Sequence, residues 1–207
     1  MGWRLSATFE GVEDGASANY PDFRIFRSER SHSHEAQEDC IARWTPCTPE
    51  TAATCSAVSF YFAQKLHREL GIPIGVVLQP YAGTPIAAYD LEVAKKQLAK
   101  DFPFYFVQLP SWFPAQTVPV EADAAWAVSR EMMRLVARSI PNTGVAVSID
   151  TGDDILLHPK DKKPIGLRLA YLALKKTYNV DFVEYGPFYK SHRVEGDKIV
   201  LTFDSVG

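Results

Sequence analysis

The sequence has few cysteines, no excess of charge and no long hydrophobic run, and each shortage excludes a class of protein. Its cysteines are Cys40, Cys47 and Cys55, an odd number without a CxxC spacing. A disulfide framework and a zinc knuckle are therefore disfavoured, although one disulfide pair stays open.

Charge and hydropathy exclude further classes. Lys plus Arg number 22 against 25 Asp plus Glu. The resulting net charge of -3 provides no positive electrostatic potential that would attract nucleic acid or an anionic membrane. Apolar stretches are broken well before the roughly 18 residues that a transmembrane helix needs. Polar residues follow Met1 closely, so we expect no secretory signal. We therefore expect neither nucleic acid nor a membrane as partner.

What is present is the composition of an ordinary globular domain. The 207 residues are 46% hydrophobic and 23% charged, which is enough for one domain with a buried core. After a largely irregular start with one short edge strand over 23–26, strands and helices alternate. The pattern predicts helices over 48–70, 122–138 and 164–178, buried strands over 72–79, 102–109 and 145–149, and a hairpin over 189–194 and 198–203. This order predicts an α/β fold with a parallel sheet covered on both faces and a short C-terminal β-hairpin.

Two loops follow predicted strands directly, where open α/β sheets bind ligands. In the first, residues 79–85, Gly83 could turn the backbone sharply and present its N–H as an oxyanion donor. A plain turn is the alternative. The second, residues 150–159, places Asp150, Asp153 and Asp154 close before His158. A carboxylate that accepts a hydrogen bond from imidazole lets histidine act as base and then as acid, and a solvated acidic turn is the alternative.

Other candidate groups favour structural explanations. His32 and His34 lie in a polar loop without further spaced ligands, so we expect no metal site there. Ser56 falls inside a predicted helix, where its hydroxyl would bond to a preceding carbonyl rather than attack a substrate. Trp126 is expected in the core.

Four long segments together resemble the sialate O-acetylesterases, carbohydrate esterases of the SGNH (GDSL-like) hydrolase superfamily. In chain order they are WTPCTPETAATCSAVSFYFAQKL, GIPIGVVLQPYAGTPIAAY, FPFYFVQLPSW and PNTGVAVSIDTGDDILLHPKDKKPIGLRLAYLAL. The resemblance implies a flavodoxin-like three-layer α/β/α sandwich over residues 1–185, with residues 186–207 starting a β-rich region. It also implies removal of O-acetyl groups from sialic acid or related sugars, without a cofactor or metal.

The resemblance also implies roles for particular residues. His158 matches the catalytic histidine of the family's IHPK-like motif. Asp153 is our first choice for the acid that orients it and Asp150 the second, because Leu156 stands where family members commonly carry an Asp. Gly83, within the family's GGT block, is the candidate oxyanion donor, with Thr84 beside it as a substrate-binding residue.

Three family features have no counterpart in this sequence. The family's nucleophilic serine lies in a GQSNM motif, and Met1–Ser6 matches only the residues that follow that serine. The WYQGE motif and the rest of the C-terminal β-rich region are also missing. Two hypotheses follow: an O-acetylesterase-like hydrolase, or a catalytically dead fragment or pseudoenzyme that at most binds acetylated carbohydrate. For the second we expect no acetate release, because loss of one member of a catalytic triad costs on the order of 10⁶-fold in rate.

Overall fold

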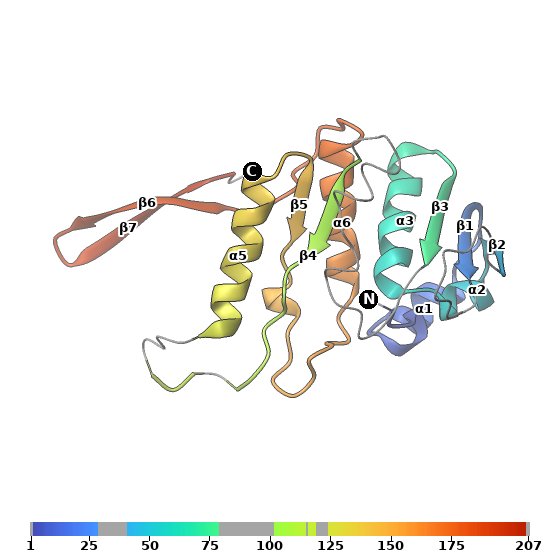
Figure 1. Ribbon diagram of the computed structural model, residues 1–207, viewed down its shortest axis with the longest axis horizontal. Coiled ribbons are helices and arrows are strands. Elements are labelled where there is room, and N and C mark those ends of the chain that lie inside the picture. Colours follow the sequence, from blue (N-terminus) through green and yellow to red (C-terminus); the bar gives the residue numbers. More distant parts are fainter. Residues whose placement is uncertain (1, 29–40, 79–101, 115, 119–123, 206–207) are drawn as a thin grey trace, which may run out of the picture.

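The computed structural model describes residues 2–28, 41–78, 102–114, 116–118 and 124–205 (Figure 1). In its first half, strands β1 (Tyr20–Ser28), β2 (Ala42–Cys47) and β3 (Ile74–Leu78) form a sheet in the order β2-β1-β3. Strand β1 pairs antiparallel with β2 and parallel with β3, in register from Phe23 opposite Ile74 to Arg27 opposite Leu78. Before this sheet come a 3-10 turn, η1 (Leu5–Ala7), and a short helix, α1 (Gly11–Ala16).

Helices α2 (Pro49–Thr54) and α3 (Ala57–Leu70) replace the single helix expected over 48–70. The start is as predicted: Thr48 caps α2 in a reciprocal capping box with Thr51, and Pro49 occupies the first turn. The helix is interrupted at Cys55, whose backbone is extended, and Ser56 then caps α3 by accepting a hydrogen bond from the Ser59 N–H. Ser56 is therefore a cap and not a mid-helix residue.

The second half repeats the strand–helix alternation. Strands β4 (Phe104–Val107) and β5 (Thr143–Ala146) pair in parallel, joined through helix α5 (Ala125–Ser139). A 3-10 turn, η3 (Ile149–Thr151), and helix α6 (Lys163–Lys176) follow. Helix α6 packs against β4, β5 and α3, so the contact between α3 and α6 joins the two halves (Figure 1). The α/β fold with parallel strand pairs is confirmed.

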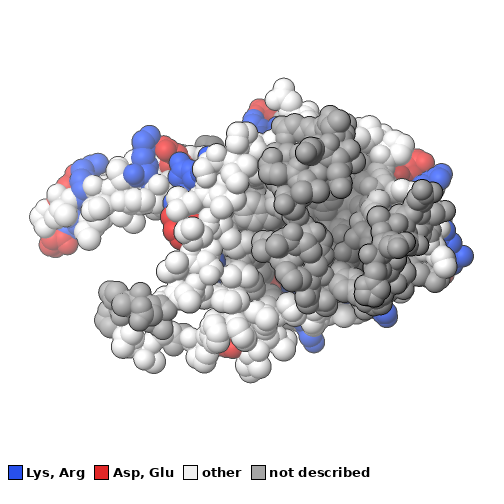
Figure 2. All heavy atoms as spheres, viewed as in Figure 1, with Lys and Arg blue, Asp and Glu red and all other residues white. Residues whose placement is uncertain are grey.

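The C-terminal hairpin also forms where the alternation predicts it. Strands β6 (Phe188–Glu195) and β7 (Lys198–Asp204) turn at Gly196, whose positive φ of 60° suits glycine. The hairpin projects from the body as an arm (Figures 1 and 2). Apolar side chains on it are exposed, namely Tyr189, Val194, Ile199, Leu201 and Phe203.

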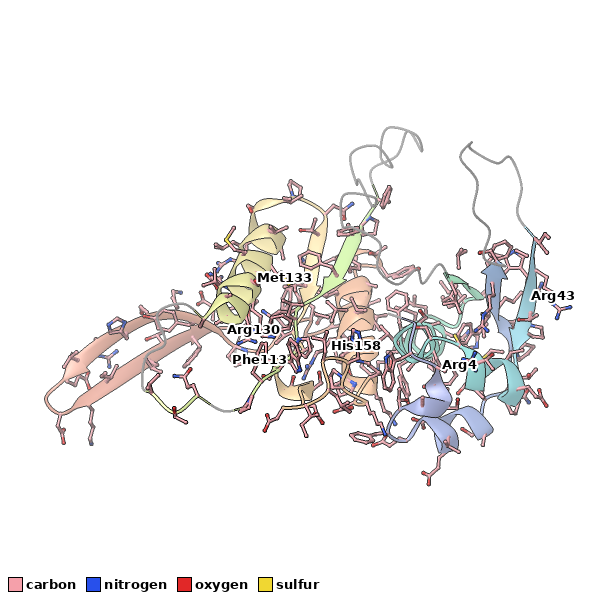
Figure 3. All side chains as sticks on the ribbon, turned by 60° about the horizontal axis from the view of Figure 1, so that its bottom comes forward. Arg4, Arg43, Phe113, Arg130, Met133 and His158 are labelled. Carbon is pink, nitrogen blue, oxygen red and sulfur yellow. The ribbon has the colours of Figure 1, made fainter. Side chains whose placement is uncertain are left out.

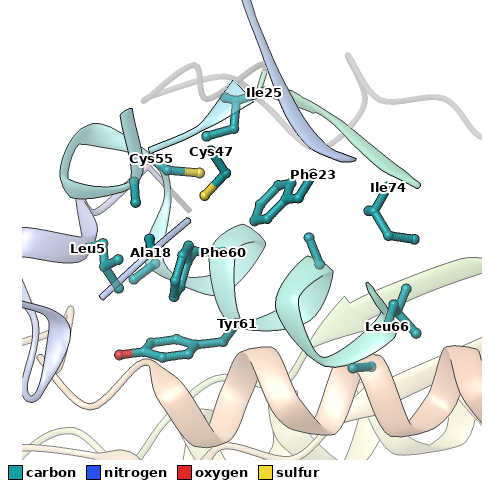
Figure 4. Packing of buried hydrophobic residues seen from close by; sticks show 14 of the residues in the cluster. Leu5, Ala18, Phe23, Ile25, Cys47, Cys55, Phe60, Tyr61, Leu66 and Ile74 are labelled. Atoms are coloured by element: carbon teal, nitrogen blue, oxygen red, sulfur yellow. The ribbon is translucent and has the colours of Figure 1, made fainter. Parts of the chain in front are cut away.

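The main core lies between the first sheet and helices α3 and α6 (Figure 4). Phe60 is its centre, with ring centroids 6.2 Å from Phe23 and 5.4 Å from Tyr61. The Tyr61 hydroxyl donates a 2.8 Å hydrogen bond to Asp14, and burial together with that carboxylate raises the Tyr61 pKa. Lys163 at the start of α6 also bonds to Asp14 and to Glu10, so one polar cluster ties α1 to α6.

Cys47 and Cys55 are free thiols within this core, and burial raises the pKa of each to about 12 (Figure 4). Because the thiolate is the reactive form, both should resist alkylation. We expect iodoacetamide at pH 8 to leave both unmodified in the native protein and to modify both in urea, as measured by peptide mass spectrometry. Modification of either thiol before unfolding would contradict this burial. Cys40 lies outside the described residues.

Several local expectations were wrong, each for a reason of tertiary pairing. Strand β1 is central rather than an edge, because β2 pairs on its other side. Strand β3 is not buried on both faces, since Val77 is 57% exposed. Helix α5 has no fully buried residue, so Trp126, which was expected in the core, lies outside it. In the part of the chain described, no helix is both long enough and apolar enough to cross a membrane.

Candidate active site

The loops that follow β4 and β5 leave the same edge of the parallel pair and contact each other. Ser111 of the first loop donates its hydroxyl to the Ile149 carbonyl at 2.6 Å, and the Asp153 N–H donates to the Ser111 carbonyl at 3.2 Å. Gly152 fits tightly here, because a Cβ at this position would lie 2.3 Å from the Ser111 oxygen. The loop that carries the predicted histidine is thus positioned by the neighbouring strand.

His158 lies exposed near the end of this second loop (Figure 3). Its ring forms no hydrogen bond with any residue in the described ranges, whereas the next residue, Pro159, is buried and anchors the loop. One residue further on, the Lys160 carbonyl accepts a 3.2 Å hydrogen bond from the Phe9 N–H. The imidazole is therefore accessible from solvent, whereas the backbone beside it is fixed by the packing of Pro159 and by the hydrogen bond at Lys160.

Asp153, the first choice for the orienting acid, lies in the same loop. Its Oδ1 accepts hydrogen bonds from the backbone N–H groups of Ile155 and Leu156, at 2.8 and 2.7 Å. These bonds lower the pKa of Asp153, and the bond from Leu156 contributes most. The carboxylate is therefore charged at neutral pH. The two hydrogen bonds shape the loop between Asp153 and His158 and use only Oδ1, which leaves Oδ2 as an acceptor. Its role toward His158 stays a prediction.

Asp150, the second choice, pairs with a helix instead. Arg168 of α6 donates from both terminal nitrogens to the two Asp150 oxygens, each at 2.6 Å, and also donates to the Val147 carbonyl at 2.8 Å. This two-bond pairing lowers the pKa of Asp150. Asp150 is thus held by α6 at the base of the loop.

This pairing predicts a pH-dependent contribution to stability. The folded-state pKa of Asp150 is depressed, so its stabilisation is present at neutral pH and is lost as pH falls through that depressed value. Because the Asp150 side chain is 54% exposed, we expect Asp150→Asn to lower the unfolding free energy at pH 7 by no more than about 1 kcal/mol. Near pH 2 the variant and the parent should coincide in urea unfolding. Asp181→Asn is the control, because the Asp181 side chain is fully exposed in its pair with Lys175. Equal losses at both pH values for Asp150→Asn would contradict the assignment.

Two charged residues between His158 and α6 were not singled out by the sequence. Lys162 is only 3% exposed, and burial lowers the pKa of its ammonium. Burial also raises the pKa of the neighbouring Asp161, and the charges of Arg168 and Lys162 offset part of that rise. The sequence places both in a lysine-rich stretch, a composition that favours solvent exposure, and only the packing shows that they are partly or wholly desolvated.

The remaining predicted site residues fall elsewhere. Gly83 and Thr84 lie in 79–101, outside the described residues, as do His32 and His34. Within the described ranges, no group of three or more His, Cys, Asp and Glu side chains could hold a metal ion.

Sequence reasoning missed a cluster of aromatic rings beside this loop. Trp112 and Phe113 lie in the loop after β4, with ring centroids 4.1 Å apart, and the Trp126 ring of α5 lies 5.4 Å from that of Trp112. The Trp112 indole N–H donates to the Ile155 carbonyl at 3.5 Å, which joins the cluster to the His158 loop. The available signal was a Trp-Phe pair in a loop directly after a predicted strand.

Comparison with known proteins adds one informative likeness. No protein-family model matches the chain, and no curated protein matches it. A solved structure described as a novel carbohydrate acetylesterase from Xanthomonas citri matches with a TM-score of 0.84 and 25% sequence identity. The match covers 99% of this chain and 60% of the other protein. The fold is a carbohydrate-esterase-like α/β fold. The chain spans about 60% of the length of that protein, and the matched part includes the strands, loops and helices described above.

Proposed function

We propose that this chain is a carbohydrate O-acetylesterase-like hydrolase that removes O-acetyl groups from sialic acid or related sugars. The observation that carries the proposal is the match, over almost the whole chain, to a carbohydrate acetylesterase. The exposed His158, on a loop after β5, lies where α/β enzymes bind ligands. The choice of a sialic acid rests on the sequence resemblance alone.

In the proposed reaction, His158 takes a proton from an attacking water as the water oxygen bonds to the acetyl carbonyl carbon. The carbon–oxygen bond to the sugar then breaks, and His158 returns the proton to the departing sugar oxygen. The acetyl group leaves as acetate, because the water oxygen has replaced the sugar oxygen on its carbonyl carbon. Asp153 orients the imidazole and stabilises its cation, and the backbone at Gly83 and Thr84 stabilises the oxyanion. No metal or cofactor is part of the proposal.

A second candidate function is binding of acetylated carbohydrate without hydrolysis. It is favoured by the serine hydroxyls at the bases of the β4 and β5 loops, which are used within the protein: Ser111 donates to the Ile149 carbonyl and Ser148 to the Gln108 carbonyl. Among the described residues, no serine or threonine hydroxyl bonds to His158. A mechanism through a covalent acetyl-enzyme needs such a hydroxyl, activated by the base.

Acetate release from 9-O-acetylated sialic acid distinguishes the two functions. The purified 207-residue chain is compared with His158→Ala and with His192→Ala, a control on the distant hairpin. The hydrolase predicts release that falls about 10³-fold or more in His158→Ala, stays unchanged in His192→Ala and is insensitive to chelators. Background release by all three chains, with sugar binding intact, would establish the second function. Measurable hydrolysis that survives in His158→Ala would overturn the role of His158.

A further inference from the structure

The β1–β2 strand pair carries two arginines directly opposite each other. Arg27 of β1 is paired with Arg43 of β2 in the antiparallel register, so both side chains leave the same face of the sheet. Arg27 follows the buried Ile25 by two residues, which places this face on the core side of β1. Like charges at directly opposite positions destabilise a sheet. The free chain therefore keeps a repulsive pair where an uncharged pair would be more stable.

Both arginines line one groove, which we call the arginine groove. It has a volume of about 630 Å³ and lies between this face of the sheet and α2. Its lining also includes the hydroxyl-bearing residues Thr45, Thr51 and Thr54. The volume is within the range of pockets that hold small molecules. The described lining contains no Asp or Glu, so its charges are all positive.

Most guanidinium N–H groups in this groove remain available to a ligand. Arg27 donates from one terminal nitrogen to the Thr54 carbonyl, and Arg43 forms no hydrogen bond or ion pair with any residue in the described ranges. A guanidinium carries five N–H donors in a planar fork and binds phosphate oxygens through parallel hydrogen bonds. Two such forks on one face match the two negative charges of a phosphoryl group, whereas a carboxylate would neutralise only one of them.

The other polar groups of the groove do not oppose an anion. Free carbonyl oxygens would repel it, but the Thr45 hydroxyl donates to the Ile25 carbonyl at 3.2 Å, and the Thr54 hydroxyl donates to the Thr51 carbonyl at 3.2 Å. The Thr54 carbonyl accepts from Arg27. Each hydroxyl oxygen keeps lone pairs that can accept from a ligand O–H. The groove thus offers positive charge to an oxyanion and acceptors to hydroxyl groups beside it.

The groove lies at the carboxyl end of β1. Arg27 and Ser28 are the last residues of this strand, and Arg27 stands opposite Leu78, the last residue of the parallel strand β3. Ligands of open α/β sheets bind beyond the carboxyl ends of parallel strands. Figure 3 shows Arg43 at the outer edge of the first sheet and His158 in the second half of the fold.

We propose that the arginine groove binds the doubly charged phosphoryl group of a small phosphate monoester or of free phosphate, held between Arg27 and Arg43. The inference goes beyond the proposed function, because the hydrolysis uses neither residue. A phosphate monoester is mostly doubly charged above its second pKa of about 6. Its binding relieves the repulsion between the two arginines and stabilises the folded chain.

Isothermal titration calorimetry at pH 7.5 and constant ionic strength tests the proposal with three probes: glycerol 3-phosphate, inorganic phosphate and glycerate, which carries a carboxylate instead. For the parent chain we expect saturable binding of both phosphates, with dissociation constants of about 1 mM or below, and at least tenfold weaker binding of glycerate. Tighter binding of glycerol 3-phosphate than of inorganic phosphate would identify an organic phosphate as the ligand. Equal binding would identify the free ion.

Variants of the two strands locate the binding. Arg43→Gln should weaken both phosphates at least tenfold, and Arg43→Lys should weaken them several-fold, because lysine keeps the charge but lacks the fork. Arg24→Gln is the matched control, since it removes the same charge from the opposite face of β1 and should bind as the parent does. Without ligand, the melting temperature of Arg43→Gln should equal or exceed that of the parent, because one of two like charges is gone.

Three results would overturn the proposal. The first is the absence of saturable phosphate binding to the parent. The second is unchanged binding in Arg43→Gln, and the third is an equal loss in Arg24→Gln, which would show attraction by diffuse surface charge. A melting temperature of Arg43→Gln below that of the parent would contradict the repulsion between the arginines. Phosphate should raise the melting temperature of the parent more than that of Arg43→Gln, and equal shifts would show a general salt effect only.

Discussion

Gly166→Ala is expected to lower the unfolding free energy by about 2–3 kcal/mol, the cost of overpacking a filled core. Gly166 lies on α6 where this helix crosses α3, and a Cβ there would lie 2.7 Å from the Tyr61 Cβ and 2.8 Å from the Val58 carbonyl oxygen. Neither neighbour is the flexible end of a side chain, so the helices themselves must separate. Because this contact joins the two halves of the fold, the loss should appear in a single cooperative transition.

Helix propensity works against this expectation and makes the test sharper. In an isolated helix, alanine is more favourable than glycine by about 1 kcal/mol. A melting temperature lowered by several degrees would therefore show that the crossing outweighs propensity. Gly186→Ala is the matched control, since a Cβ there meets nothing within 4 Å and stability should hold or rise slightly. An unchanged or raised melting temperature for Gly166→Ala would mean that the two helices are not this close.

Gly152→Ala should disrupt the contact between the β4 and β5 loops. The added Cβ would lie 2.3 Å from the Ser111 carbonyl oxygen and 2.5 Å from the Ser111 Cβ, and the first of these is backbone. We expect a loss of about 1–3 kcal/mol, together with a changed tryptophan emission spectrum, because Trp112 bonds to the displaced loop. If hydrolysis is detectable in the parent, it should fall with the displacement of His158.

A graded comparison separates this effect from general destabilisation. Gly144→Ala in β5 would place its Cβ 3.0 Å from the Tyr105 ring and 3.1 Å from Leu172, both side-chain atoms that can adjust. It should lower stability in urea unfolding while leaving tryptophan emission unchanged. Parent-like emission and stability in Gly152→Ala would contradict the described packing of the two loops.

Local pattern predicted the elements whose signals are contained within a short window. Helix capping is encoded locally by Thr48-Pro49, and the hairpin turn by Gly196. The buried strands are indicated by the apolar runs that end near Leu78 and Val107. The break between α2 and α3 has no such signal. It is fixed by distant backbone: Leu5 donates to the Cys55 carbonyl at 2.9 Å, and Ala57 donates to the Trp3 carbonyl at 2.8 Å.

The candidate site likewise contains residues that a short stretch of sequence predicts and contacts that only the fold shows. His158 and Asp153 could be proposed from sequence because both follow a predicted strand within one loop. The partner of Asp150 could not, since Arg168 lies 18 residues later on another element. The aromatic cluster combines the loop after β4 with α5, and helical spacing alone favours a core position for Trp126. Only the tertiary arrangement shows which of these side chains meet.

The polar cluster that ties α1 to α6 has a consequence for the order of folding. The ion pair between Glu10 and Lys163 joins residues 153 positions apart. Ordering a chain segment against so distant a partner carries a closure cost that local contacts do not, and non-local contacts form late. During synthesis the residues of α1 leave the ribosome before those of α6, yet they can reach their final contacts only after α6 has been made. A segment that is synthesised before α6 therefore takes up its final position only after α6 is available.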